Sequence, residues 1–254
     1  MPDDERPPTA RESEEALLPR PRRLLAEVFG TFALTGVAAG ADIAGQLTGG
    51  EVDTLARAAA PALLVMALIY ALGDVSGAHF NPAVTLGFTI RRLFPVPWLV
   101  AYWVAQLAGA LVAGIVLVAL FGGDASAGVS KPHVAAPTAL AIETFLSLVL
   151  VTVILGTADR SRIVGPNAAI AVGATIAMCG LVALPVSGAS MNPARSIGPA
   201  AATGQLGDLW IFVGGAVLGS LLAVALTTAL HGPTPRDQKQ VEAATGKPAR
   251  RDDK

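Results

Sequence analysis

The chain has 254 residues, of which 53% are hydrophobic and only 15% are charged, and its net charge is −1. A soluble domain carries about 25% charged residues, so this composition predicts a membrane-embedded protein. The near-zero net charge gives no support to nucleic-acid binding, and the single cysteine, Cys179, excludes an internal disulfide.

Six apolar segments approach or exceed the roughly 20 residues that cross a bilayer. They cover residues 24–43, 58–73, 96–121, 138–157, 167–184 and 209–230. The second is short unless it begins near Leu55. The flanking stretches 1–23 and 233–254 are rich in proline and charge and predict two disordered tails. The first tail lacks the apolar core of a signal peptide. We therefore expect one membrane domain over residues 24–232, with related halves at about 24–121 and 138–230.

Two matching segments interrupt this apolar pattern. Ser76–Gly87 lies between the second and third spans and Ser187–Gly198 between the fifth and sixth, and seven of their twelve residues recur at an offset of 111. The chain thus repeats a unit of three spans and one interruption. An odd number of spans per half gives the halves opposite orientation, as in the inverted repeats of many transporters, whose transport site lies at such interruptions.

Both segments contain the tripeptide Asn-Pro-Ala. The two copies are Asn81, Pro82 and Ala83, and Asn192, Pro193 and Ala194. Asparagine is a good helix N-cap, and proline suits the first helical position, where its missing N–H costs nothing. Each copy therefore predicts a half-helix that begins abruptly at the asparagine. Two such starts meeting at mid-membrane would surround one point with two amide donors and two positive helix ends. Two ordinary loop-to-helix turns are the alternative, which the matched positions disfavour.

Basic residues predict the orientation. With the N-terminus inside, eight arginines lie on the inner side, and the outer loops carry only Arg57 and Lys131. The inner arginines are Arg20, Arg22, Arg23, Arg91, Arg92, Arg160, Arg162 and Arg236. The positive-inside rule then places both tails in the cytoplasm. On this topology Asp42, near the end of the first span, falls on the outer side. The first re-entrant segment enters from the cytoplasm and the second enters from outside.

Few ionisable groups lie inside the membrane domain. Glu27 and Glu143 occupy equivalent places in the two halves, where they either relay protons or accept N–H bonds from a re-entrant segment. Arg195 lies on the first turn of the second half-helix. It either snorkels to the interface or serves as a filter group that donates to a solute and repels cations. His79 either faces the cytoplasmic vestibule or is a packed side chain with one hydrogen bond.

These segments closely resemble the signature loops of the major intrinsic protein family, the aquaporins and glycerol channels. Ala26–Phe32 and Ala141–Phe145 extend the resemblance, which covers about Leu24 to Leu230. It implies an all-α membrane protein with six transmembrane helices and two re-entrant half-helices. It also implies a homotetramer in the plasma or inner membrane with one pore per subunit, a structural role for the two glutamates and a filter role for the arginine.

The remaining filter positions follow from the family's spacing and fall on Pro61, Gly180 and Ala189. Water-selective relatives typically place an aromatic residue at the first position and histidine at the second, whereas glycerol channels typically place aromatic residues at the first and third. Pro61 departs from both patterns. Small filter residues combined with Met191–Pro199 look most like the nodulin-like intrinsic proteins of plants and their bacterial relatives, which carry glycerol, urea or uncharged metalloid hydroxides.

The sequence therefore predicts a passive channel for small neutral solutes, meaning water plus glycerol, urea or uncharged metalloid hydroxides, that excludes protons and ions. A strict water channel is the nearest alternative. A proton-coupled secondary transporter, using Glu27, Glu143 and Asp74, is an alternative from another class. The sequence contains no nucleophile–base pair, metal cluster or phosphate loop, so we expect no enzyme activity, cofactor or metal.

Overall fold

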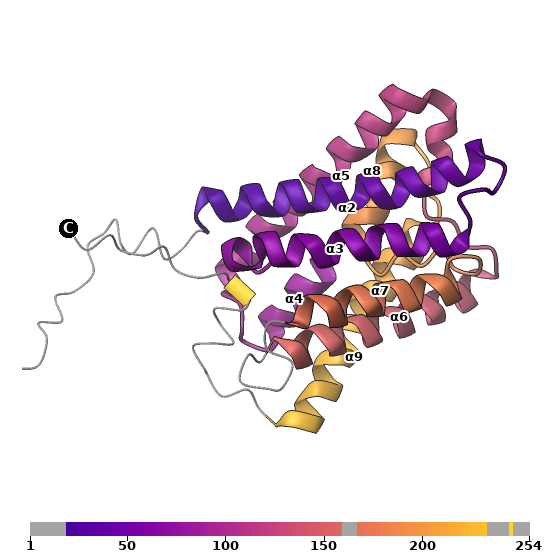
Figure 1. Ribbon diagram of the computed structural model, residues 1–254. Coiled ribbons are helices and arrows are strands. Elements are labelled where there is room, and N and C mark those ends of the chain that lie inside the picture. Colours follow the sequence, from indigo (N-terminus) through magenta and orange to yellow (C-terminus); the bar gives the residue numbers. More distant parts are fainter. Residues whose placement is uncertain (1–18, 159–166, 233–243, 246–254) are drawn as a thin grey trace, which may run out of the picture.

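The computed structural model describes residues 19–158, 167–232 and 244–245, and within these ranges the chain forms helices and connecting loops without a strand. Figure 1 shows the arrangement of the helices. In chain order they are α2 (Pro21–Leu47), α3 (Thr54–Ser76), α4 (Pro82–Ile90), η1 (Val96–Trp98), α5 (Leu99–Phe121), η2 (Gly122–Gly128), α6 (Ala136–Thr157), α7 (Ala168–Ala183), α8 (Pro193–Thr203) and α9 (Leu209–His231).

Five helices of the described chain, α2, α3, α5, α6 and α9, are long and apolar enough to cross a bilayer. The remaining predicted span, the fifth at residues 167–184, corresponds to α7, which is apolar but has only 16 residues. The second span is longer than the apolar run suggested, because Asp53 caps α3 by accepting a bond from the Ala56 amide at 2.9 Å. Helix α2 begins at Pro21, inside the predicted tail of residues 1–23.

The two halves pack in the same way. Helix α2 lies against α3 and α5, its counterpart α6 lies against α7 and α9, and α3 meets α7 across the halves. Glycines make the closest helix contacts possible: a Cβ at Gly109 would overlap the Val28 carbonyl, and a Cβ at Gly219 would overlap the Thr144 carbonyl. Small residues allow such backbone approach between membrane helices. Val28 and Thr144 each directly follow one of the paired glutamates, so the same close helix contact occurs in both halves.

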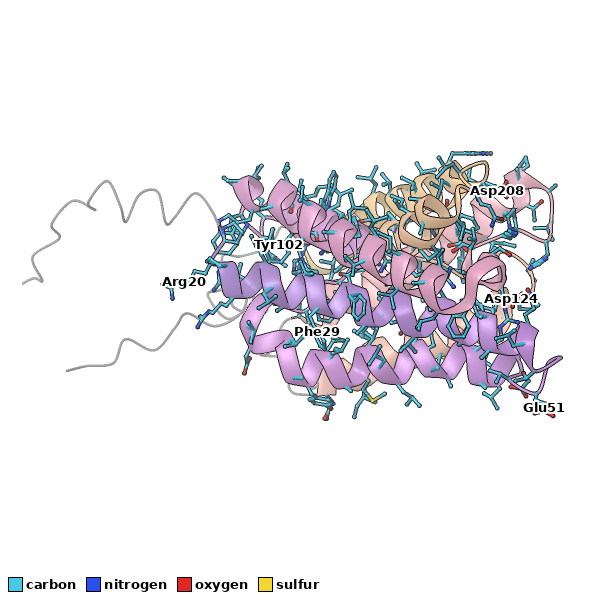
Figure 2. The ribbon with its side chains drawn as sticks, turned by 90° about the horizontal axis from the view of Figure 1, so that it is seen from above. Arg20, Phe29, Glu51, Tyr102, Asp124 and Asp208 are labelled. Carbon is cyan, nitrogen blue, oxygen red and sulfur yellow. The ribbon has the colours of Figure 1, made fainter. Side chains whose placement is uncertain are left out.

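The bundle has two distinct ends. Figure 2 places Arg20 at one end and Glu51, Asp124 and Asp208 at the other, and we call these the Arg20 end and the Asp208 end. Helix α4 finishes at the Arg20 end, where Arg91 Nη1 donates to Thr228 Oγ1 at 2.7 Å, near the last turn of α9. Helix α8 finishes at Gly204, shortly before Asp208. The half-helices therefore leave the centre in opposite directions.

Two expectations about the loops change with the structure. Arg57, assigned to an outer loop, lies within α3, because this helix begins before the apolar run that predicted it. Asp42, assigned to the outer side at the end of the first run, lies within α2, which continues to Leu47. Most of the two predicted tails, 1–23 and 233–254, lies outside the described residues, as do Arg160, Arg162 and Arg236. Ala244 is described: it is buried in a cluster with Val84 and Phe88.

Candidate functional site

Both half-helices begin at the asparagine of an Asn-Pro-Ala tripeptide. The Asn81 side-chain oxygen accepts a bond from the Ala83 amide at 2.9 Å. The Asn192 oxygen accepts bonds from the amides of Ala194 at 3.0 Å and Arg195 at 3.3 Å. Pro82 and Pro193 fill the first helical positions. The sequence dictates these starts locally, because asparagine satisfies free amides of the first turn and proline has no amide to satisfy.

The two helix starts are also bonded to each other. Asn81 Nδ2 donates to the Met191 carbonyl at 2.8 Å, and Asn192 Nδ2 donates to the Phe80 carbonyl at 2.8 Å. Each loop thus supplies the acceptor for the other loop's asparagine. A side-chain amide has two N–H groups, and these bonds use one of each pair. The exchange fixes both positive helix ends at one place in the centre of the fold.

Glu27 holds the first loop by accepting hydrogen bonds from it. Its carboxylate accepts bonds from Ser76 Oγ at 2.7 Å, the His79 amide at 3.0 Å, the Phe80 amide at 2.8 Å and Gln106 Nε2 at 2.8 Å. The side chain is fully buried. Loop amides at membrane depth have no water to bond, so this carboxylate provides the acceptor that the re-entrant backbone requires.

Glu143 makes the equivalent contacts with the second loop. It accepts bonds from Ser187 Oγ at 2.7 Å, the Ser190 amide at 3.1 Å and the Met191 amide at 2.9 Å. This side chain is also fully buried. The described residues provide no counterpart of Gln106 for this carboxylate, so the second set has three donors where the first has four.

The loops share an unusual backbone as well. Ala78 and Phe80 have φ values of +51° and +48°, and the equivalent Ala189 and Met191 have +44° and +54°. Left-handed conformations in residues other than glycine cost about 1–3 kcal/mol each and persist only where the surroundings fix them. The buried carboxylates and the exchanged asparagine bonds supply that restraint in both halves.

A cavity of about 490 Å³ passes between the two halves and includes both asparagines in its lining. Helices α3 and α7 each contribute one face, with lining residues at intervals of four. They include Arg57, Pro61, Val65, Ile69 and Gly73 on α3 with its C-cap Gly77, and Ala168, Val172, Ile176 and Gly180 on α7 with its C-cap Leu184. Both sequence-assigned filter residues of these helices therefore lie on lining faces, and Ala189 joins them from the second loop.

The paired glutamates are absent from the lining. Glu27 and Glu143 face the loop backbones, whereas Asp74 lines the cavity at the Arg20 end. The structure thus separates the three carboxylates that a proton relay would have to bring together.

Arg195 lines the cavity with its guanidinium held against the wall. It is only 5% exposed, its Nη2 donates to Asp42 Oδ2 at 2.7 Å, and its Nη1 donates to Ser130 Oγ. Ser130 in turn bonds Ser196 Oγ at 2.8 Å. Sequence reasoning did not find Ser130 or Asp42 as partners. A carboxylate one residue before the end of an apolar run was the one available signal for Asp42.

His79 lies between the cavity and a cluster of aromatic rings. It lines the cavity but is only 4% exposed, and it stacks on Phe88 with ring centroids 4.8 Å apart and an interplanar angle of 18°. Phe94 and Tyr102 contact it from other sides. Its Nδ1 is 3.0 Å from Thr85 Oγ1, which also accepts a bond from Gln106.

Comparison with known proteins agrees with this geometry. The model of the major intrinsic protein family matches residues 16–227. The chain belongs to the major intrinsic protein family. Aquaporin NIP1-1 of Zea mays is 42% identical over 202 residues, covering 79% of this chain and 71% of the relative. Aquaporin NIP3-1 of Oryza sativa subsp. japonica is 38% identical over 225 residues, covering 86% and 72%.

A solved structure shows the same fold. The X-ray structure of the aquaglyceroporin from Plasmodium falciparum superimposes with a TM-score of 0.72 at 24% identity, covering 83% of this chain and 96% of that one. The predicted all-α membrane fold and the resemblance to nodulin-like members of the major intrinsic protein family are confirmed. The chain is therefore a multi-pass membrane channel.

Proposed function

We propose that the protein is a passive channel for water and small neutral solutes, namely glycerol, urea or uncharged metalloid hydroxides, and that it excludes protons and ions. One observation carries the proposal: a single cavity reaches from Arg57 near the Asp208 end to Asp74 at the Arg20 end and is lined by Asn81 and Asn192 on the way. A continuous lined passage with neutral donors at its centre suits solutes that need no coupling ion.

Ion exclusion rests on the positive groups of the passage. Two helix N-termini meet at the bonded asparagines, and each carries a partial positive charge. The Arg195 guanidinium adds a full charge to the lining. Half-helix dipoles and an arginine form an electrostatic barrier to cations and protons in aquaporin-type pores. Neutral solutes meet the same groups only as hydrogen-bond donors.

Permeation by larger solutes rests on the small filter residues. Pro61, Gly180 and Ala189 line the cavity together with Arg195, and none of the three is aromatic or carries an imidazole. Similarity to NIP aquaporins supports water as one of the solutes. A strict water channel would need a narrower site. A proton-coupled transporter would need its carboxylates on the path, but Glu27 and Glu143 are not in the lining.

Stopped-flow light scattering of proteoliposomes tests this function with gradients of water, glycerol, urea and boric acid. We expect all four to cross faster than in empty liposomes. Ala189→Phe should suppress the three solutes more than water. Residue 189 is preferable to Gly180 for narrowing the site, because a Cβ at 180 would lie 2.8 Å from the Ala58 Cβ on the packed α3 helix. Water flux without any solute flux would mark a strict water channel, and solute accumulation driven by a proton gradient would mark a transporter.

The assembly and orientation belong to the same proposal. We expect a homotetramer with one pore per subunit in the cell membrane and both termini in the cytoplasm. Basic residues at the Arg20 end, Arg20 and Arg91 among them, support this orientation by the positive-inside rule. Labelling of engineered cysteines from each side of right-side-out vesicles, and the mass of the purified protein in detergent, test these two points.

A further inference from the structure

One carboxylate at the Asp208 end binds two guanidinium groups. Asp42 Oδ2 accepts from Arg195 Nη2 at 2.7 Å, and its Oδ1 accepts from Arg57 Nε at 2.9 Å and Nη2 at 2.8 Å. The three residues come from α8, α3 and α2, and all three line the cavity. The Asp42 side chain is 9% exposed and that of Arg57 is 32% exposed. The cluster has a formal charge of +1.

Asp42 fixes the position of the filter arginine. A guanidinium is a planar group of five N–H donors, so bonds from both of its terminal nitrogens determine where its plane lies. Asp42 holds one terminal nitrogen of Arg195 and Ser130 holds the other. The bond to Asp42 joins two charged groups and is the stronger kind. Without Asp42, Arg195 keeps only its serine, and two cations at the mouth lose their shared counter-charge.

A backbone acceptor lies beside these donors. Pro61 is inside α3 and has no amide N–H, so the Arg57 carbonyl, four residues earlier, lacks its usual helical donor. Residues 57 and 61 are both on the lining face of α3, so this carbonyl lies between two lining positions. The two guanidinium groups therefore lie close to a carbonyl that lacks its usual helical donor.

We propose that Asp42 is a further specificity-determining residue of this channel. It is a positioning residue that holds Arg195 and Arg57 side by side, as a donor surface on which a polyol or an uncharged metalloid hydroxide exchanges its water hydrogen bonds. The inference rests on the proposed function and deepens it. It predicts that hydroxylated solutes depend on Asp42 more than water does, because a single water molecule needs fewer wall contacts at one time.

Asp42→Asn tests the role with almost no change in size. The measured quantity is the ratio of glycerol to water permeability in proteoliposomes, which does not depend on how much channel is inserted. We expect the ratio to fall about fivefold, the effect of losing one charge-assisted bond. Cation exclusion should be retained, because the charge of the cluster rises from +1 to +2. Asp42→Glu keeps the charge and should restore part of the ratio, and Arg57→Met should lower it about twofold by removing the second donor group.

Asp53→Asn is the matched control. Asp53 caps α3 through the Ala56 amide and is not in the cavity lining, and asparagine caps a helix equally well, so the ratio should stay at the wild-type value. If Asp42→Asn does not fold, Asp42→Asn combined with Arg57→Gln keeps the cluster at +1 and should lower the ratio at least as far as Asp42→Asn, because it also removes the second donor group. A wild-type ratio in both variants would overturn the role of Asp42 while leaving the channel proposal intact. Absence of glycerol flux in the wild type would instead overturn the proposed function.

Discussion

The two re-entrant loops share a backbone path and a buried carboxylate but differ in what surrounds their half-helices. The first is packed among rings: His79 lies against Phe88, Phe94 and Tyr102. The second is surrounded by hydroxyls and charge. Ser190 Oγ is 2.5 Å from Ser196 Oγ, which bonds Ser130, and Ser130 and Asp42 hold Arg195.

The difference lies at two equivalent positions of the repeat. His79 corresponds to Ser190, and Val84, which follows the first Asn-Pro-Ala, corresponds to Arg195. The shared backbone path and buried carboxylate are what each half needs in order to bury a loop in the membrane. We infer that the aromatic surroundings of the first loop serve mainly stability, whereas the polar network of the second serves mainly selection of the solute. Variants in one half can therefore be compared with variants in the other.

The largest effect should come from removing either carboxylate. Glu27→Leu and Glu143→Leu each leave buried donors without an acceptor, and each such group costs about 1–3 kcal/mol. We expect both variants to fail to yield a monodisperse protein, or to lose the greater part of their unfolding free energy in detergent. The matched Glu→Gln variants keep one acceptor oxygen and should be milder, with Glu27→Gln the more damaging because its partner set is larger. If only one of the two Leu variants were unstable, the two glutamates would not have equivalent structural roles.

A smaller effect is expected from making the second half resemble the first. Arg195→Val gives α8 the residue that α4 has at the equivalent position, Val84, and removes the full positive charge from the lining. Cation leak through proteoliposomes should rise by about tenfold, or roughly 1.4 kcal/mol of barrier, while neutral solute flux continues. The control is Arg57→Met, which leaves Arg195 paired with Asp42. Unchanged cation exclusion in Arg195→Val liposomes with normal solute flux would argue against a filter role.

The smallest effects should separate stability from selection. His79→Phe keeps a ring between Phe88 and Tyr102 but loses the contact with Thr85, which is worth about 1 kcal/mol of stability. We expect a lower melting temperature and unchanged solute ratios.

Ser130→Ala removes one of the two bonds that hold Arg195 and should shift the glycerol-to-water ratio about twofold with little change in melting temperature. The opposite pattern in both variants would reverse the division of roles between the halves.

Local chemistry made the centre of the fold predictable from sequence. The asparagines and prolines determine where α4 and α8 begin because capping acts within one helical turn. The spacing from these motifs also led to Pro61 and Gly180, which lie on lining faces of α3 and α7. Their part in selecting the solute stays a prediction.

Contacts between distant residues were harder to predict. Asp42 and Arg195 are 153 residues apart, and the sequence placed Asp42 only at the outer end of the first apolar run, 24–43. Helix α2 continues through polar Gln46 to Leu47, and hydropathy alone does not mark such an extension. Gln106 bonds Glu27 in the first half only, so comparison of the two repeats gave no signal for it.

The exchanged asparagine bonds also bear on how the channel is made. Phe80 and its partner Asn192 are 112 residues apart in the chain, so a ribosome delivers the first loop well before the second. Until the second half inserts, the first half-helix has its own cap and its glutamate but not the cross-bond at its tip. The cross-bonds at the centre of the channel can therefore form only after the second loop has been made. A chain terminated after α5 would carry the first re-entrant loop without the partner for Asn81 and Phe80.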